Sequence, residues 1–329
     1  MQLSIFYSRP WRRSILYSLF SILLFTAPAH AQPTVLLVVG APGSPEFGTN
    51  FSHQASLWQS ACTAASARLI TIGLVGASET NDVDVLHAAL TAEPKDGPAA
   101  LWLVLIGHGT FDGKEARFNL RGPDVSASDL ALWLKPFHRP LAVIDTSSSS
   151  APFLAKLSAT NRVIITATRS GHEQNYARFG NYFAEAISSP DADLDKDGQV
   201  SLLEAFLIAS RRVAEFYKLE GRLATEHALL DDNGDGLGTP ADWFRGLRAV
   251  KRPKENAGLD GLLARQCVLI PSAADAALSA EQRARRDALE REVFLLREQK
   301  PNLSEADYYR RLEDLLLQLA RLYPANTKS

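Results

Sequence analysis

The sequence predicts an α/β domain with a parallel sheet and helices on both faces, followed by a calcium-loop region and a C-terminal helical hairpin. Short, continuous apolar runs alternate with segments of helical periodicity, as in buried parallel strands joined by helices. Two acidic loops that contain glycine come after these runs, and apolar residues at helical spacing flank a proline near the end of the chain. The composition, with 46% hydrophobic and 22% charged residues, is that of a globular protein.

The first 31 residues have the order of a cleaved secretory signal. Three arginines precede an apolar run over Ile15–Phe25, and Ala29-His30-Ala31 then supplies the small residues of a cleavage site. This run is shorter than the ~18 apolar residues that a membrane span needs. We therefore expect residues 1–31 to be removed and the protein to be periplasmic or secreted, without a membrane anchor. An uncleaved anchor helix is the alternative.

Five apolar runs predict the strands of the sheet. They are Val35–Val39, Leu69–Leu74, Leu101–Ile106, Leu141–Ile144 and Val163–Ile165. Helical spacing over residues 50–67 and 83–90 predicts the first two connecting helices. We assign residues 32–190 to this domain and expect function in the loops that follow the C-terminal ends of its strands.

Residues 253–329 predict a separate helical region. Ser279 and Gln282 form a capping box that opens a helix, and Pro301 ends that helix. A second helix begins at Ser304 and carries leucines on one face. We expect an antiparallel hairpin that packs within the chain, with a surface for a partner as the alternative.

Residues 193–204 match the EF-hand calcium loop at each ligand position. Calcium prefers oxygen ligands, which this spacing gathers around one point, and a glycine at the sixth position allows the sharp turn. The expected ligands are the side chains of Asp193, Asp195, Asp197 and Glu204, the carbonyl of Gln199, and a water held by Ser201. The alternative, a solvated acidic turn, requires neither this glycine nor the closing glutamate.

A second loop of the same spacing begins at Asp231. The expected ligands are Asp231, Asn233, Asp235, the carbonyl of Leu237, and Asp242 at the closing position. Pro240 and the short closing carboxylate make this match poorer, so a plain turn is an equal alternative. We place both loops in residues 191–252, as part of the α/β domain, and expect calcium to stabilise the fold rather than to signal.

Polar residues follow the third and fourth predicted strands. His108 lies between two glycines after the third strand, and Ser147 lies just after the fourth. Because the C-terminal ends of neighbouring parallel strands meet at one edge, these residues can form a base and a nucleophile. The Gly109 N–H is then the expected oxyanion donor.

These segments resemble the caspase/legumain group of cysteine peptidases. LVLIGHGTFDG (103–113) is similar to that group's strand followed by His-Gly, and LAVIDTSSSSAPF (141–153) is similar to its strand followed by the nucleophile. RVIITAT (162–168) is similar to the next strand, and the resemblance extends over about residues 34–190. It implies that His108 is the general base and that Ser147 occupies the place of the nucleophilic cysteine.

The serine at this position changes the expected chemistry. A thiol with a pKa of about 8.5 ionises beside a histidine, whereas a serine hydroxyl needs an oriented base and a formed oxyanion hole. We therefore expect a non-catalytic peptidase-like scaffold that binds a peptide or protein partner. An active calcium-dependent hydrolase that uses Ser147 and His108 is the alternative. Cys62 and Cys267 lie elsewhere, and the sequence leaves their pairing open.

Charge and motifs exclude several other classes of protein. A formal net charge of −2 without a basic block argues against a nucleic-acid partner. The sequence contains no zinc-binding His spacing and no phosphate-binding glycine loop. Calcium is therefore the one cofactor that we expect, and the oligomeric state is left open.

Overall fold

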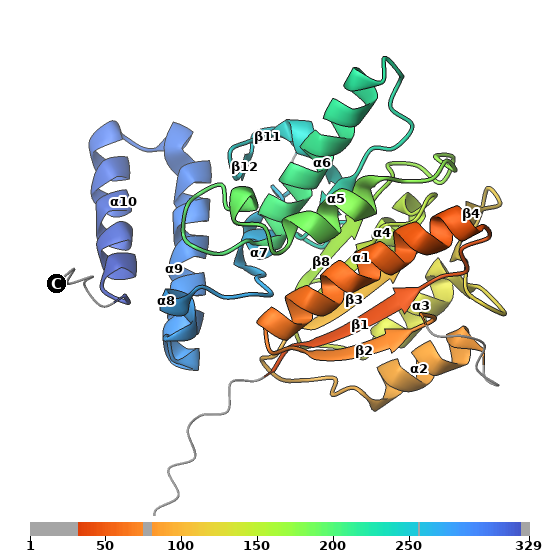
Figure 1. The fold of residues 1–329 in the computed structure, drawn as a ribbon. Helices are drawn as coiled ribbons and strands as arrows, with labels where there is room; N and C mark the ends of the chain where they lie inside the picture. Colours follow the sequence, from red (N-terminus) through yellow and green to blue (C-terminus); the bar gives the residue numbers. More distant parts are fainter. Residues whose placement is uncertain (1–31, 75–80, 256, 324–329) are drawn as a thin grey trace, which may run out of the picture. The chain divides into compact units, whose positions relative to one another are not determined.

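The computed structural model describes residues 32–74, 81–255 and 257–323 (Figure 1). These residues belong to one compact unit. The predicted signal over residues 1–31 lies outside the described residues. Within the described part of the chain, no helix combines the length and apolar character needed to cross a membrane.

A seven-stranded sheet lies at the centre of the fold, in the order β10-β9-β8-β7-β3-β1-β2. Five of these strands, β2, β1, β3, β7 and β8, pair in parallel, which confirms the predicted parallel sheet. β9 and β10 add an antiparallel edge that the sequence analysis did not predict. The bounds are β1 Thr34–Val39, β2 Arg68–Ile72, β3 Leu101–Ile106, β7 Leu141–Asp145, β8 Arg162–Thr166, β9 Leu229–Asp231 and β10 Thr239–Pro240.

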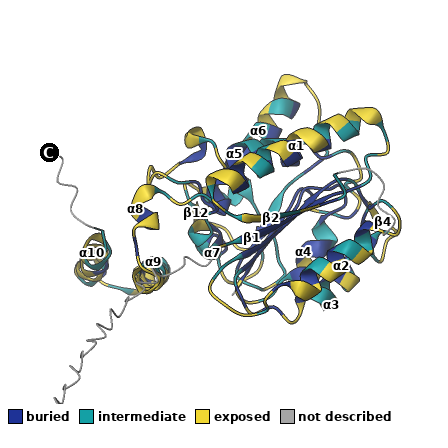
Figure 2. Ribbon diagram, turned by 60° about the horizontal axis from the view of Figure 1, so that its bottom comes forward, coloured by how far each residue is buried: buried dark blue, intermediate teal, exposed yellow. Residues whose placement is uncertain are grey.

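Helices cover both faces of the sheet, as predicted (Figures 1 and 2). One face carries α1 (Pro45–Ala64), α5 (Phe179–Ala186) and α6 (Leu202–Leu219), and the other carries α2 (Asp82–Ala92), α3 (Ala127–Leu134) and α4 (Ala151–Leu157). Alternate residues of each strand enter opposite cores, so Leu37 packs under α1 while Leu36 packs on the other side. Burial on both faces explains why the strands are continuous apolar runs.

Two small antiparallel sheets complete the α/β part. The first follows β3 and consists of β4 (Gly109–Phe111), β5 (Ala116–Phe118) and β6 (Val125–Ser126). Phe118 packs against the end of β3, and a Cβ on Gly107 would lie 2.9 Å from its ring. The second consists of β11 (Phe244–Arg245) and β12 (Arg248–Ala249). These strands are too short to show a period in the sequence.

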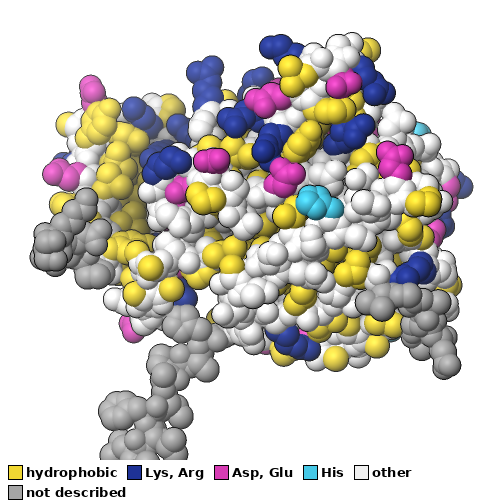
Figure 3. Space-filling view, in the orientation of Figure 1, with side chains coloured by type: hydrophobic (Ala, Val, Ile, Leu, Met, Phe, Trp, Pro, Cys, Tyr) yellow, Lys and Arg dark blue, Asp and Glu magenta, His cyan; other side chains and the backbone are white. Residues whose placement is uncertain are grey.

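The C-terminal region is helical, and the predicted hairpin is confirmed. It consists of α9 (Ala280–Gln299) and α10 (Glu305–Ala320), which pack through Leu289, Val293, Leu296, Tyr308 and Leu315. The Ser279–Gln282 capping box opens α9. The shorter elements are α7 (Leu262–Gln266), α8 (Ala273–Ala276), and the 3-10 turns η1 (Pro190–Ala192), η2 (Ala241–Trp243) and η3 (Lys300–Asn302). Figure 3 shows apolar side chains gathered over the hairpin, where Leu295, Tyr309, Leu316 and Leu317 are exposed.

Candidate functional site

His108 lies directly after β3 and is held by contacts with other elements. Its Nε2–H donates a hydrogen bond to the carbonyl oxygen of Pro42 (3.3 Å). Its ring packs edge-on against the rings of Phe47 and Phe51, with centroid distances of 4.6 and 5.1 Å. Burial lowers the pKa of the imidazole, and the hydrogen bond to Pro42 opposes that effect only in part. His108 is therefore a neutral imidazole at physiological pH, and Nε2 carries its proton.

Ser147 lies just after β7, and its side chain is fully buried. Its hydroxyl donates to Asp145 Oδ1 at 2.6 Å, and its backbone N–H donates to the same oxygen at 3.0 Å. Asp145 is also fully buried, and this burial raises its pKa to about 6, against the effect of the two hydrogen bonds. Within the described residues Asp145 Oδ2 has no hydrogen-bond partner. The Ser147 proton thus points to Asp145 and not to His108.

Gly109, which follows β3, is hydrogen-bonded to Ser148, which follows β7. Its N–H donates to Ser148 Oγ (3.2 Å), and that hydroxyl donates back to the Gly109 carbonyl (3.1 Å). A Cβ at this position would lie 2.2 Å from the Ser148 carbonyl oxygen and 2.9 Å from Ser147 Oγ. The strand ends are therefore in direct contact, and the N–H predicted to be an oxyanion donor lies inside this contact.

The serine run after β7 belongs to the interior of the molecule. All four serines are at most 3% exposed. Ser149 has a φ of +56°, and its N–H donates to the Glu173 carbonyl (2.8 Å). The Ser150 hydroxyl lies 3.1 Å from that of Thr168, which follows β8. These bonds tie the turn to the neighbouring loop, so the site where the resemblance places a nucleophile is closed to solvent.

The two cysteines are free thiols. Burial raises the pKa of Cys62 to about 11, and burial together with Asp232 raises that of Cys267 to about 12. Nucleophilic attack requires a thiolate, which neither residue forms at physiological pH. Neither thiol therefore replaces the cysteine that is absent at position 147.

The first acidic loop brings three carboxylates together. Asp193, Asp195 and Asp197 each offer an oxygen, and these oxygens lie within 4.8 Å of one another. Asp193 accepts hydrogen bonds from the N–H groups of Lys196 (2.6 Å) and Gly198 (3.1 Å). Gly198 has a φ of +88°, so the turn requires glycine at this point. Burial, and then repulsion from Asp195, raises the pKa of Asp197, an effect that a bound cation would relieve.

Glu204 closes this loop from the first turn of α6. One carboxylate oxygen accepts the N–H groups of Leu194 (2.7 Å) and Asp195 (3.3 Å). The other accepts the N–H (2.9 Å) and the hydroxyl (2.8 Å) of Ser201. The N–H of Gln199, at the seventh position, donates to the carboxylate at the fifth (3.0 Å). All of the expected metal ligands are oxygen atoms, so the residues present fit a calcium ion.

The second acidic loop begins where β9 ends, at Asp231. This carboxylate accepts the N–H groups of the two loop glycines, each at 3.1 Å. Asn233 Oδ1 accepts the N–H of Asp235 (2.9 Å), and Asp235 Oδ1 accepts the N–H of Leu237 (2.8 Å). The predicted ligands from the first to the seventh position therefore lie in one turn.

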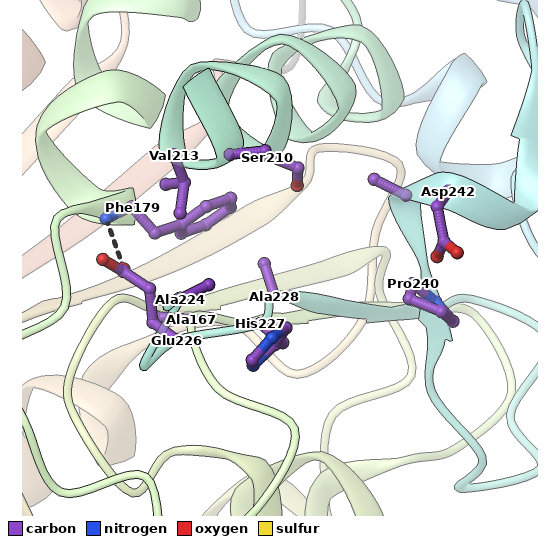
Figure 4. Close-up of a pocket in the computed structure, with 12 residues that line it drawn as sticks. Ala167, Phe179, Ser210, Val213, Ala224, Glu226, His227, Ala228, Pro240 and Asp242 are labelled. Atoms are coloured by element: carbon purple, nitrogen blue, oxygen red, sulfur yellow. Dashed lines mark hydrogen bonds between the residues drawn. The ribbon is translucent and has the colours of Figure 1, made fainter. Parts of the chain in front are cut away.

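The closing position of the second loop differs from the prediction. Asp242 lies in η2, is exposed, and lines a neighbouring pocket (Figure 4). Asp260 instead contacts the loop, and it accepts the N–H groups of Asp232 (3.0 Å) and Asn233 (3.2 Å) and the hydroxyl of Thr239 (2.5 Å). Asp260 could not be identified from the sequence, because nothing in its own segment resembles a calcium loop.

The pocket beside Asp242 has a volume of about 190 Å³ and is walled mainly by apolar side chains, among them Phe179 and Val213 (Figure 4). Glu226 is its buried polar group, and it accepts the Phe179 N–H (2.9 Å) and the Tyr217 hydroxyl (3.2 Å). Burial raises the pKa of Glu226. The pocket lies just beyond the C-terminal end of β8, the edge at which open α/β sheets bind ligands.

No protein-family model matches the chain, and no curated protein matches it in sequence. Among solved structures, the initiator caspase Dronc of Drosophila is similar, with 13% identity and a TM-score of 0.42 over 63% of this chain and 81% of that one. Caspase-1 from Spodoptera frugiperda has 9% identity and a TM-score of 0.41 over 62% and 87%. Chaetomium thermophilum Raptor has 14% identity and a TM-score of 0.35 over 49% and 18%. The likeness is one of fold alone.

Proposed function

We propose that this chain is an exported calcium-binding protein that uses a caspase/legumain-like scaffold without peptidase activity. The observation that carries the loss of activity is the buried hydrogen bond from Ser147 to Asp145 (2.6 Å). A nucleophile must reach its substrate and must pass its proton to a base. Ser147 is fully buried and its hydroxyl donates a hydrogen bond to Asp145, whereas Nε2 of His108 is bonded to a backbone carbonyl.

The proposed cofactor is calcium. In the first loop it is held by Asp193, Asp195, Asp197 and Glu204, and in the second by Asp231, Asn233 and Asp235. The close approach of the three aspartates supports this proposal, because like charges at that distance are costly without a cation. A bound calcium ion would neutralise these carboxylates and would link the two ends of the first loop, which Glu204 closes. In the exported protein it stabilises the fold, which is the role consistent with a compartment rich in calcium.

The proposed partner is a peptide or another protein. The pocket between β8 and α6 supports this, because its apolar walls and its volume of about 190 Å³ suit a single apolar side chain. The proposed binding site is therefore this pocket, and not the closed ends of β3 and β7. Phe179→Ala would enlarge the pocket and weaken capture of such a peptide.

A peptide-library assay tests the loss of activity. The protein of residues 32–329 is assayed with calcium and with chelator, beside Ser147→Ala and His108→Ala. We expect no cleavage by any of these proteins when they are folded and calcium is present. Cleavage by the wild type that disappears in both variants would establish a serine hydrolase and overturn the proposal.

A further inference from the structure

We propose that the pocket between β8 and α6 binds a lysine side chain, with the ammonium group held by Ser210 and by two acidic residues of the lining, Glu226 and Asp242. This inference rests on the proposed function, because it takes from there that a side chain of a peptide or protein partner enters the pocket. It adds the chemical class of that side chain, which is an apolar stem that ends in a positive charge.

The walls of the pocket suit a stem of methylene groups. Phe179 from α5 and Val213 from α6 line the pocket, together with alanines of α6 and of the segment before β9 (Figure 4). The volume of about 190 Å³ holds one side chain. A lysine stem gains free energy when its methylenes leave water for such walls, and it makes no demand for hydrogen bonds along its length.

Ser210 offers an unused hydrogen-bonding group to this pocket. Its hydroxyl points from α6 into the pocket, and its oxygen is buried (Figure 4). A serine hydroxyl within a helix commonly donates to the carbonyl one turn earlier. The Ser210 oxygen has no such bond, and no other partner among the described residues. A buried hydroxyl without a partner costs free energy, which an N–H donor on a ligand would remove.

The ionisable residues that line the pocket are acids, or are paired with an acid. Glu226 and Asp242 belong to the described lining, which contains no lysine or arginine. His227 also lines the pocket, and Glu173 Oε1 lies 2.5 Å from its Nδ1, so a carboxylate balances any charge on the ring. Arg178 acts on Glu226 from outside the lining, and its guanidinium stacks on an aromatic ring of α6 at 4.3 Å. Charge in the pocket therefore favours a cation.

The bonds of Glu226 favour an ammonium group over a guanidinium. One of its oxygens accepts the Phe179 N–H (2.9 Å), and the other accepts the Tyr217 hydroxyl (3.2 Å). A guanidinium pairs best with two free oxygens of one carboxylate, and Glu226 does not offer such a pair. An ammonium group is a compact charge that takes single acceptors from separate residues. The available acceptors therefore suit lysine better than arginine.

The test compares two capped alanine peptides, one with a central lysine and one with a central norleucine, which keeps an unbranched stem and lacks the ammonium group. Each is titrated into the protein of residues 32–329 with calcium present. The methyl NMR signals of Ala224 and Ala228, which line the pocket, report binding there. We expect the lysine peptide to bind about tenfold more tightly than the norleucine peptide, as a hydrogen bond to a charged group requires.

Ser210→Ala is the decisive variant, because its hydroxyl has no partner to lose among the described residues and the variant should fold like the wild type. It should weaken binding of the lysine peptide about tenfold and leave binding of the norleucine peptide unchanged. Glu226→Gln is less suitable, because that carboxylate also holds the start of α5. The matched control is Glu215→Gln, which removes a charge from the exposed side of α6 and should change neither affinity.

The outcomes separate this inference from the function on which it rests. If neither peptide shifts the two methyl signals, both the inference and the proposed peptide site are wrong. Equal affinity for the two peptides would overturn the inference and leave the peptide site standing. The same holds for a preference for lysine that survives in Ser210→Ala, or that Glu215→Gln weakens as much as Ser210→Ala does.

Discussion

Replacing Ser147 by alanine tests the buried pair with Asp145 through its dependence on pH. The substitution removes the hydroxyl that donates to Asp145 Oδ1 at 2.6 Å and keeps the backbone N–H bond to the same oxygen. Burial raises the pKa of Asp145 from 3.8 to about 6, so folding favours its neutral form. The stability that this group contributes is complete below pH 3.8 and decreases as the pH rises to about 6.

The size of the effect follows from the charge on Asp145. The hydroxyl stabilises the carboxylate, so its removal raises the folded-state pKa of Asp145 further. Below about pH 6 the folded protein holds a neutral acid, and the substitution costs about 1 kcal/mol, as for a neutral hydrogen bond. Above that pH the lost bond is charge-assisted, and the cost rises to about 2–3 kcal/mol.

The assay is urea unfolding at pH 5 and pH 8 with calcium present, beside Ser148→Ala as the control. Ser148 is also buried, but among the described residues its hydroxyl bonds only to the backbone of Gly109. The control should therefore lose the same free energy of unfolding at both pH values. An equal loss for Ser147→Ala at both pH values, or a loss that also grows with pH in Ser148→Ala, would refute the proposed charge-assisted bond.

Three further changes test other parts of the structure. Gly109→Ala should lower the free energy of unfolding by about 3 kcal/mol, since the new Cβ would meet the Ser148 carbonyl oxygen at 2.2 Å, and a loss below about 1 kcal/mol in urea unfolding would contradict this close contact. Glu204→Gln should reduce the rise in Tm that calcium produces, whereas Glu215→Gln, on the exposed side of the same helix, should keep the full rise. Leu289→Ala should cost about 2–4 kcal/mol in hairpin stability, measured by hydrogen exchange in α9, while Leu317→Ala, at 49% exposed, should change it by less than about 1 kcal/mol.

The central sheet was predictable because its strands are buried on both faces. β3 and β7 are uninterrupted apolar runs, and their bounds agree with the predicted ones within a residue. β9 was missed because it has three residues, the last of which is also the first ligand of the predicted second loop. A strand that short shows no period, and the sheet it joins supplies its stability.

In the sequence, Asp145 stands two residues before Ser147. Their spacing places them on the same side of an extended chain, and the structure joins them by a hydrogen bond. What the sequence did not show was their complete burial. The burial of these two side chains depends on Gly109, which follows β3, and on the loop that follows β8.

The contact of Asp260 with the second loop was not predictable from the loop pattern, because that pattern describes one continuous segment. Asp260 contacts this loop from a later segment of the chain, and the contact exists only once the chain has folded.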